Sequence, residues 1–346
     1  MASLIGNKPN QVPTNGDLGS MAYQDASLYQ TRSELQGMRN RIINGDMRID
    51  QRNAGASVTP ASGDFTLDRW KVENATDATI AIQQSSTAPA GFSNSLSVTI
   101  STGDASIGAT QYATIRQTIE GYNIADFGFG TANAKTVTLS FWVRSSVTGT
   151  LSGTLRGASN GQFYPYTYTV SSANTWEYKT VTISGATSGT WGSTNDEGLR
   201  VYFTFASGST YQAAAGSWTT TVCLGATGAT NIAETTGATF YITGVQLEVG
   251  SVATLFERRQ YGQELALCQR YFEKAAGTIR GSAFNQAGVA WAYWFFKETK
   301  RASPTVSYVG AYYTGVETVN PDYVGVSAND TNYPTLGTNS TAEAEL

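Results

Sequence analysis

Histidine is absent from this chain of 346 residues, and cysteine occurs only twice, as Cys223 and Cys268. The absence of histidine excludes a Ser-His-Asp triad, a Cys-His dyad and any metal site built on imidazole. Two cysteines are too few for a disulfide framework. Both have hydrophobic neighbours, so we expect two small buried side chains; a bridge or a reactive thiol is the less favoured alternative.

Charged residues are also scarce, at 14% of the chain, and the formal net charge is -4. A broad basic face is therefore not expected, which excludes nucleic acid as a partner. No apolar run approaches the roughly 20 residues that span a bilayer, so we expect no membrane insertion. The first 20 residues lack the charged start and apolar core of a signal peptide, and we expect the chain to be made in a cytoplasm.

Strand-forming residues are abundant, and 36 glycines separate them into short stretches. This pattern predicts an all-β protein, with a two-sheet sandwich of jelly-roll type over residues 61–257. Within 136–144, apolar residues at Val137, Leu139, Phe141 and Val143 alternate with mostly polar ones, as in a strand with one buried face. The predicted strands are 79–84, 95–101, 110–119, 136–144, 163–170, 175–184, 199–206 and 239–248.

Residues 1–60 are predicted to form a separate N-terminal segment with a short helix that begins near Asp25. Its apolar stripe is too short to be stable alone, because isolated helices below about 12 to 15 residues are marginal. A partner helix from an identical chain and a helix folded back on its own domain are equally favoured. The residues of this stripe are Leu28, Leu35, Met38 and Ile42.

Residues 258–346 are predicted to form a helical connector followed by a small C-terminal β domain. The connector has a second apolar stripe at spacings of four, three and four, which we expect three chains to pack around an axis; a helix against its own sandwich is the alternative. Glu257, Arg258 and Arg259 precede it and are expected to pair with a neighbouring chain. The stripe consists of Tyr261, Leu265, Cys268 and Phe272.

Aromatic residues suggest where carbohydrate could bind, because aromatic rings stack on sugar rings. A first set, Tyr164, Tyr166 and Tyr168, lies on one strand face and is expected in the core. The C-terminal domain has more aromatics than a small core needs, so several should be exposed. The candidate glycan-binding residues there are Trp291, Tyr293, Tyr312, Tyr313 and Tyr323.

Carboxylates in the strand region do not predict an active site. A glycosidase needs two carboxyl groups about 5 to 10 Å apart, one of them with a raised pKa. The acids of this chain instead lie beside Asn, Gly or Ser, where they satisfy turn backbone. Calcium is the only cofactor considered, and no D-x-D-x-D loop is present to support it. The residues weighed were Asp104, Asp126, Asp196, Glu197, Glu317 and Asp322.

Five stretches have a more specific character than the strand pattern: "NRIINGDMRIDQRNAG" (40–55), "FTLDRWKV" (65–72), "TVTLSFWVRSSVTGT" (136–150), "NTWEYKTVTISG" (174–185) and "ITGVQLEVGSVATLFERRQYGQELALCQRYFE" (242–273). Together they resemble tail fibre and appendage proteins of tailed bacteriophages. The resemblance covers residues 40–346. Members usually have Pro where this chain has Leu255.

This resemblance implies a homotrimeric, non-enzymatic structural protein of the virion. The jelly roll would resemble a carbohydrate-binding module, and a distal β domain would face a bacterial surface glycan. Residues 10–25 are similar to the segments by which such fibres join a tail adaptor, nozzle or baseplate protein. The attachment residues would be Pro9, Pro13, Leu18 and Tyr23.

Such a protein would be assembled in the infected cytoplasm and would reside in the virion tail. Two alternatives remain open at this point. One is an adaptor or spacer that carries another receptor-binding protein. The other is a depolymerase that cleaves capsule or lipopolysaccharide with paired acids.

Overall fold

The computed structural model describes residues 38–158, 161–280, 289–309, 313, 315–329 and 334–346. Residues 40–346 form one compact unit, and the unit before it, residues 1–39, lies almost wholly outside the described part. The predicted helix contacts Leu28 and Leu35 therefore fall outside the described residues, as do the attachment residues Pro9, Pro13, Leu18 and Tyr23.

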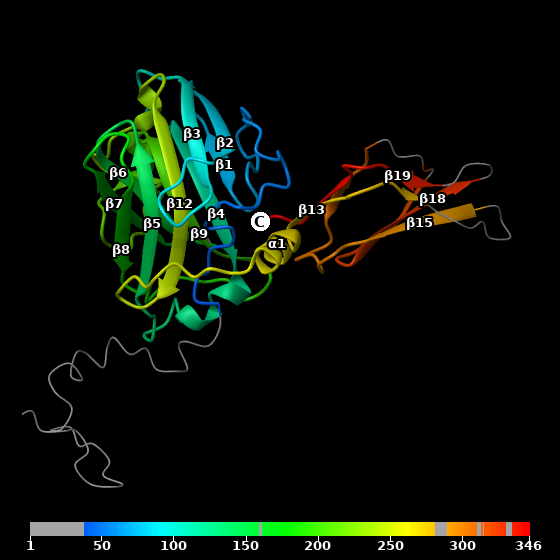
Figure 1. The fold of residues 1–346 in the computed structure, drawn as a ribbon. Helices are drawn as coiled ribbons and strands as arrows, with labels where there is room; N and C mark the ends of the chain where they lie inside the picture. Colours follow the sequence, from blue (N-terminus) through cyan, green and yellow to red (C-terminus); the bar gives the residue numbers. More distant parts are fainter. Residues whose placement is uncertain (1–37, 159–160, 281–288, 310–312, 314, 330–333) are drawn as a thin grey trace, which may run out of the picture. The chain divides into compact units, whose positions relative to one another are not determined.

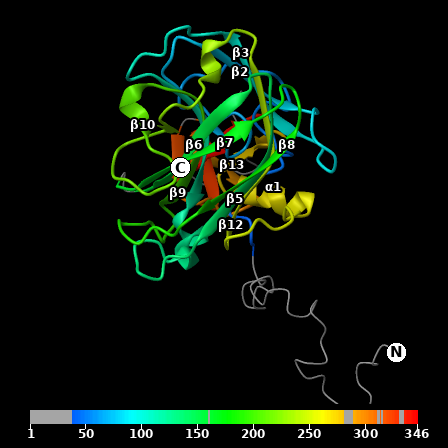
Figure 2. The same cartoon turned by 90° about the vertical axis from the view of Figure 1, so that its left-hand side faces the viewer.

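Two five-stranded sheets pack face to face in the first part of this unit (Figures 1 and 2). The β12 sheet has the order β2-β3-β12-β5-β8, and the β9 sheet has the order β1-β4-β9-β6-β7. All neighbouring strands in both sheets are antiparallel. The strands are β1 (Lys71–Asn74), β2 (Thr79–Ser85), β3 (Ser95–Thr102), β4 (Tyr112–Glu120), β5 (Val137–Ser145), β6 (Gly149–Gly157), β7 (Phe163–Val170), β8 (Glu177–Ile183), β9 (Glu197–Ser207) and β12 (Thr239–Val249).

The chain passes repeatedly from one sheet to the other, and this topology confirms the predicted jelly-roll type of sandwich. All eight predicted strands are present. The sequence analysis missed β1, which has only four residues, and β6, whose sequence GTLSGTLRG contains three glycines. Glycine disfavours strands in general, so this pattern resembled a turn.

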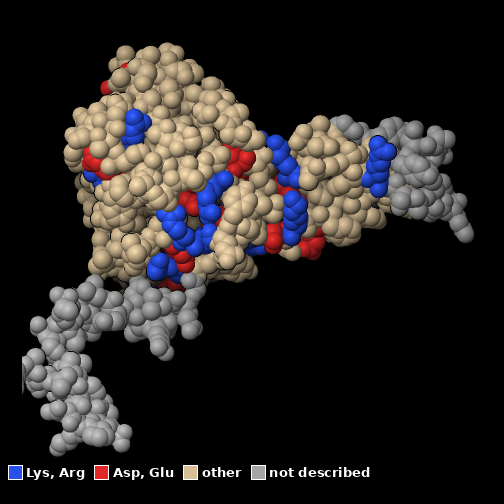
Figure 3. Space-filling view, viewed as in Figure 1, with Lys and Arg blue, Asp and Glu red and all other residues tan. Residues whose placement is uncertain are grey.

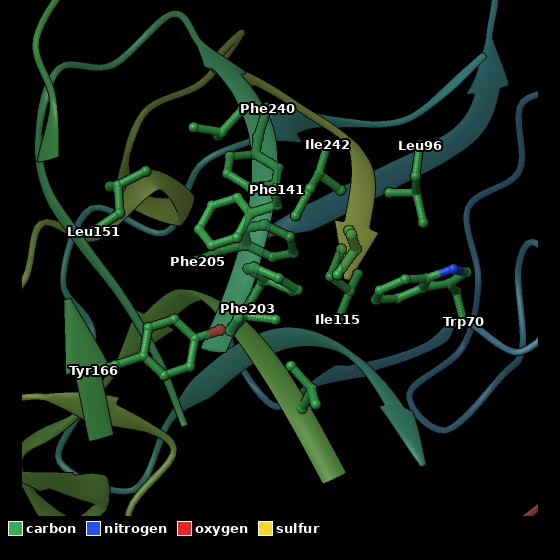
Figure 4. Packing of buried hydrophobic residues seen from close by; sticks show 14 of the residues in the cluster. Trp70, Leu96, Ile115, Phe141, Leu151, Tyr166, Phe203, Phe205, Phe240 and Ile242 are labelled. Atoms are coloured by element: carbon green, nitrogen blue, oxygen red, sulfur yellow. The ribbon is translucent and has the colours of Figure 1, made fainter. Parts of the chain in front are cut away.

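The core lies between the two sheets, where aromatic and branched side chains meet (Figure 4). Phe141 of β5 lies near its centre, with ring centroids 4.9 Å from Tyr168 and 5.0 Å from Phe203. Tyr164, Tyr166 and Tyr168 of β7 all belong to this core, as predicted. The Tyr166 hydroxyl donates to the Tyr202 carbonyl at 2.6 Å, which satisfies its polar atom within the core.

Residues 40–47 belong to the sandwich, so the predicted boundary at residue 60 does not match the fold. Ile42 and Met47 are buried in the main core, and residues 38–42 are not helical. Asn40 fixes this segment beside β12, because its Oδ1 accepts from the Leu247 N–H at 3.1 Å and its Nδ2 donates to the Val245 carbonyl at 3.0 Å. The predicted helical stripe through Met38 and Ile42 is therefore wrong: Ile42 packs inside its own chain.

After the sandwich come the helix α1 (Tyr261–Gln269) and several small sheets. Their orders are β13-β20-β16, β14-β19 and β15-β18-β17, with a further parallel pair β10-β11 within the sandwich region. No helix of the described part is long and apolar enough to cross a membrane. The remaining elements are β10 (Gln212–Ala213), β11 (Gly225–Ala226), β13 (Phe272–Lys274), β14 (Ile279–Arg280), β15 (Val289–Phe295), β16 (Thr305–Ser307), β17 (Gly315–Val319), β18 (Tyr323–Asn329), β19 (Thr335–Leu336), β20 (Thr341–Glu343), and the 3-10 turns η1 (Gly121–Asn123), η2 (Ala125–Phe127), η3 (Ser209–Tyr211) and η4 (Ile232–Glu234).

The stripe predicted along α1 is only partly available for contacts with other chains. Cys268 and Phe272 are both buried within the chain, and Phe272 lies on β13 rather than on the helix. Cys268 packs in a small cluster with Tyr271, and Leu265 packs against that cluster. Tyr261 alone is well exposed, at 56%. Two of the four predicted trimer contacts in α1 and β13 are therefore wrong, because their side chains are used to hold the helix against its own sandwich.

Candidate functional site

A groove of about 880 Å³ lies on the outer face of the β12 sheet. Strand alternation explains its aromatic lining, since Phe141 of β5 points into the core and the next residue, Trp142, must point out. Trp142 pairs in register with Tyr178 of β8, and their ring centroids are 5.4 Å apart. The groove is lined by Phe92, Ser140, Trp142, Tyr178, Gly244, Ala253, Thr254, Leu255, Phe256 and Arg258.

Gly244 lets the rings of Phe92 and Trp142 lie close to the backbone of β12. The pairing between β12 and β5 is irregular between Thr243 and Gln246, and Gly244 has a φ of 61° in the left-handed region that favours glycine. A Cβ at this position would lie 2.7 Å from Cζ of Phe92 and 3.3 Å from Cδ1 of Trp142. Any larger residue would clash with the ring of Phe92 and displace it from the groove lining.

The second wall of the groove is the segment 250–258, which follows β12 and crosses the sheet (Figure 1). The buried carboxylate of Glu248 holds it, since it accepts from Thr254 N at 2.8 Å and from Thr254 Oγ1 at 2.6 Å. Phe256 then packs edge-on against Phe92, with centroids 5.3 Å apart. Between these anchors, Leu255 is 89% exposed at the rim.

Arg258 lies where the groove meets a second cavity of about 510 Å³. Its guanidinium carbon lies 4.6 Å from the ring centroid of Phe92 and 5.8 Å from that of Phe256, so the two rings position an exposed cation. The second cavity is lined in addition by Asp46, Arg48 and Arg259. Figure 3 shows Lys and Arg side chains gathered on the side of the sandwich in view, with Asp and Glu side chains among them.

The neighbours of Arg258 serve a different purpose, which corrects the expectation that all three charged residues pair with another chain. Arg259 is buried and contacts both Glu257, at 3.3 Å, and Glu264 of α1, at 3.3 Å. Glu257 also accepts from the Asn40 N–H at 2.8 Å. These two residues therefore tie α1 and residues 40–44 to the sandwich within one chain.

The predicted glycan residues of the C-terminal domain separate into two groups. Trp291, Tyr293 and Phe295 share the outer face of β15, since the alternate residues 290, 292 and 294 are buried. Tyr293 and Phe295 are 46% and 68% exposed, and Tyr323 of β18 lies 5.8 Å and 5.5 Å from their centroids. Three of the five predicted residues, Trp291, Tyr293 and Tyr323, therefore share one face. The sequence analysis missed Phe295, although its position in the alternation identifies it.

Tyr313 is not part of that exposed face. Its ring centroid is 4.8 Å from that of Tyr308, and both rings pack against the small core of the C-terminal domain. Tyr312 lies outside the described residues. Tyr313 is thus only partly exposed, and its role in glycan binding stays a prediction.

Three of the acidic residues considered for catalysis are engaged in structural contacts. Asp126 pairs with Arg41 at 2.7 Å, Glu197 pairs with Arg200 at 2.5 Å, and Asp104 accepts from two backbone N–H groups of neighbouring turns. In the described ranges, no three His, Cys, Asp or Glu residues are close enough together to hold a metal ion.

Both cysteines are free and buried, in agreement with the prediction. Burial raises the pKa of the Cys223 thiol to about 11 and raises the pKa of the Cys268 thiol well above its ordinary value. A thiol is nucleophilic as the thiolate, so neither side chain is a reactive group at neutral pH.

No protein-family model matches this chain, and no curated protein matches its sequence. Solved structures similar to it include the enzymatically active domain of tailspike protein 4 from bacteriophage CBA120, at 14% identity and a TM-score of 0.34, over 61% of this chain and 21% of that one. They also include a carbohydrate-binding module of the CBM4 type, at 16% identity and a TM-score of 0.31, over 60% and 97% of the two chains.

A third is the family 11 carbohydrate-binding module of Clostridium thermocellum in complex with a β-1,3-1,4-mixed-linked tetrasaccharide. It is 14% identical, with a TM-score of 0.30, over 57% of this chain and 98% of that one. The chain spans about a fifth of the tailspike domain that it matches. At such TM-scores the likeness carries no argument about the site, whose interpretation rests on its own geometry.

Proposed function

We propose that the groove on the β12 sheet binds a glycan chain and that the protein is a non-enzymatic attachment protein. The observation that carries this proposal is the aromatic lining of the groove, formed by the pairs Trp142 with Tyr178 and Phe92 with Phe256. Sugar rings present apolar faces that stack on such side chains, and the hydroxyl of Ser140 offers a polar partner at the floor.

The finer proposal is that the protein is a homotrimeric tail fibre of a bacteriophage, attached to the virion through residues before Asn40. Its support is the resemblance of the five sequence stretches described above. Those stretches also contain residues that line the groove, namely Trp142, Gly244, Leu255 and Arg258. The aromatic groove favours an attachment protein over a spacer that carries another receptor-binding protein, because a spacer does not itself bind a glycan.

Replacing Trp142 by Ala tests the glycan proposal directly. We expect the affinity for bacterial surface polysaccharide to fall at least about tenfold, because a stacking aromatic at the centre of a binding site typically contributes more than 1 kcal/mol. The measurement is isothermal titration or surface plasmon resonance against polysaccharides extracted from candidate hosts. The matched control is Tyr122→Ala, since Tyr122 is 61% exposed on η1 and lies outside the groove.

Parallel loss of binding in Tyr122→Ala would contradict the assignment of the groove. A second variant, Tyr293→Ala, separates the groove from the aromatic face of β15 and β18: if Tyr293→Ala abolishes binding and Trp142→Ala does not, the site is in the C-terminal domain. Release of reducing ends from the polysaccharide by the wild-type protein would overturn the non-enzymatic part of the proposal.

The oligomeric state tests the tail-fibre part. We expect multi-angle light scattering of the full chain to give three times the 36.8 kDa of one chain. Two variants, Leu265→Asp and Tyr261→Asp, test whether α1 contributes to the trimer. The side chain of Leu265 is partly buried against its own chain, whereas that of Tyr261 is exposed. Loss of the trimer in Tyr261→Asp would therefore report a contact between chains and not a loss of local packing. A monomeric wild-type protein would contradict the trimer.

A further inference from the structure

A single exposed cation distinguishes this groove from a purely apolar platform. Arg258 lines both the aromatic groove and the second cavity, so a chain lying across the two would pass its guanidinium. The rings of Phe92 and Phe256 restrict the guanidinium from two sides, which lowers the entropy cost of holding it for a ligand. Stacking of sugar rings on aromatic side chains does not by itself require a positive charge at this position.

The charges around Arg258 are already paired, whereas Arg258 is not. Arg48 contacts Asp46 at 2.5 Å, and Arg259 contacts Glu257 and Glu264. For Arg258 no ion pair with a carboxylate is found in the part of the chain that the structure describes. The guanidinium of Arg258, which has five N–H donors, lines both cavities and is thus available to an anion there.

Resting on the proposed function, we infer that the groove recognises an acidic glycan, in which a carboxylate or phosphate group pairs with Arg258 while a neighbouring sugar ring stacks near Trp142. Guanidinium groups bind carboxylate and phosphate through paired N–H donors, so the geometry suits either anion. The Asp46 carboxylate, which also lines the second cavity, is paired with Arg48, so an anionic group of the ligand would pair with Arg258.

The test compares each bound polysaccharide with chemically matched derivatives. Carboxyl reduction converts uronic acids to neutral sugars, and hydrofluoric acid removes phosphate esters. The two treatments therefore identify which anionic group the protein recognises. We expect one of them to weaken binding of the wild-type protein by about tenfold to hundredfold, the usual effect of losing a charge-assisted hydrogen bond. Arg258→Met, which keeps apolar contact with Phe92 and Phe256, should show the same loss toward the untreated polysaccharide.

Arg144→Met is the matched control, because Arg144 also stacks on an aromatic ring of the β12 sheet, with its guanidinium carbon 5.0 Å from the centroid of Tyr241, but lies outside the groove. It should bind like the wild-type protein. If neither treatment weakens binding, or if Arg258→Met binds untreated polysaccharide normally, the acidic-glycan inference is overturned. Loss of binding in Trp142→Ala under those same conditions would still support the glycan groove, whereas failure of Trp142→Ala to affect binding would refute the groove and this inference with it.

Discussion

Replacing Glu264 by Ala is expected to lower the free energy of unfolding by about 3–5 kcal/mol, the range measured when one partner of a buried ion pair is removed. Glu264 of α1 is buried, pairs with Arg259 and accepts a hydrogen bond from the backbone N–H of Asn44. Arginine does not lose its proton in a protein, so Arg259 would stay charged and buried with only the partly exposed carboxylate of Glu257 beside it. The loss should be read from urea or guanidinium titration monitored by tryptophan fluorescence.

Asp126→Ala is the control for this experiment. Asp126 also pairs with an arginine, Arg41, but at the surface, with the Asp126 side chain 46% exposed. Surface ion pairs contribute at most about 1 kcal/mol, so this variant should unfold close to the wild-type midpoint. Equal losses in the two variants would show that Glu264 does not act through burial of its charge.

Replacing Phe141 by Ala should cost a similar amount, about 3–5 kcal/mol, because the substitution leaves a cavity at the centre of the sandwich. Phe141 is fully buried and packs edge-on against Tyr168 and Phe203 (Figure 4). Its neighbours are held in both sheets and cannot move together to fill the space. Thermal unfolding followed by circular dichroism would report the loss as a lower midpoint.

The adjacent residue provides the control. Trp142→Ala removes a side chain of similar size one position along the same strand, but from the outer face, and should cost about 1 kcal/mol or less. Phe141→Ala should therefore affect stability with little direct effect on glycan affinity, and Trp142→Ala the reverse. Comparable destabilisation by the two variants would contradict the alternation on which the groove depends.

Sequence alone was sufficient to predict the sandwich, because period-two alternation is a local signal. The residues of β5 show this most clearly, because the four alternate positions predicted to face the core are all buried: Val137, Leu139, Phe141 and Val143. The same signal placed Trp291, Tyr293 and Tyr323 in strands, and three of the five predicted glycan residues lie on a common face. β6 was missed because glycine has no side chain with which to show alternation.

The groove could not be predicted in the same way. It depends on contacts across more than 100 residues, such as those that bring Trp142 beside Gly244, and sequence spacing contains no information on them. The stripe of Leu265, Cys268 and Phe272 was misread for a related reason. Helical spacing identifies an apolar face but not what covers it, and here the chain covers Cys268 and Phe272 itself.

The segment that forms the second wall of the groove is fixed by contacts on both sides of Leu255. Glu248 holds Thr254, and Gln246 accepts from the N–H of Glu257 at 2.8 Å, whereas Leu255 between them contributes nothing to the core. Substitutions at Leu255 can therefore reshape the rim without altering the sandwich that supports it. In the proposed glycan groove, residues that set binding preference and residues that set folding stability would lie only one or two positions apart, so a library varied at this rim is expected to change the preferred ligand at little cost in stability.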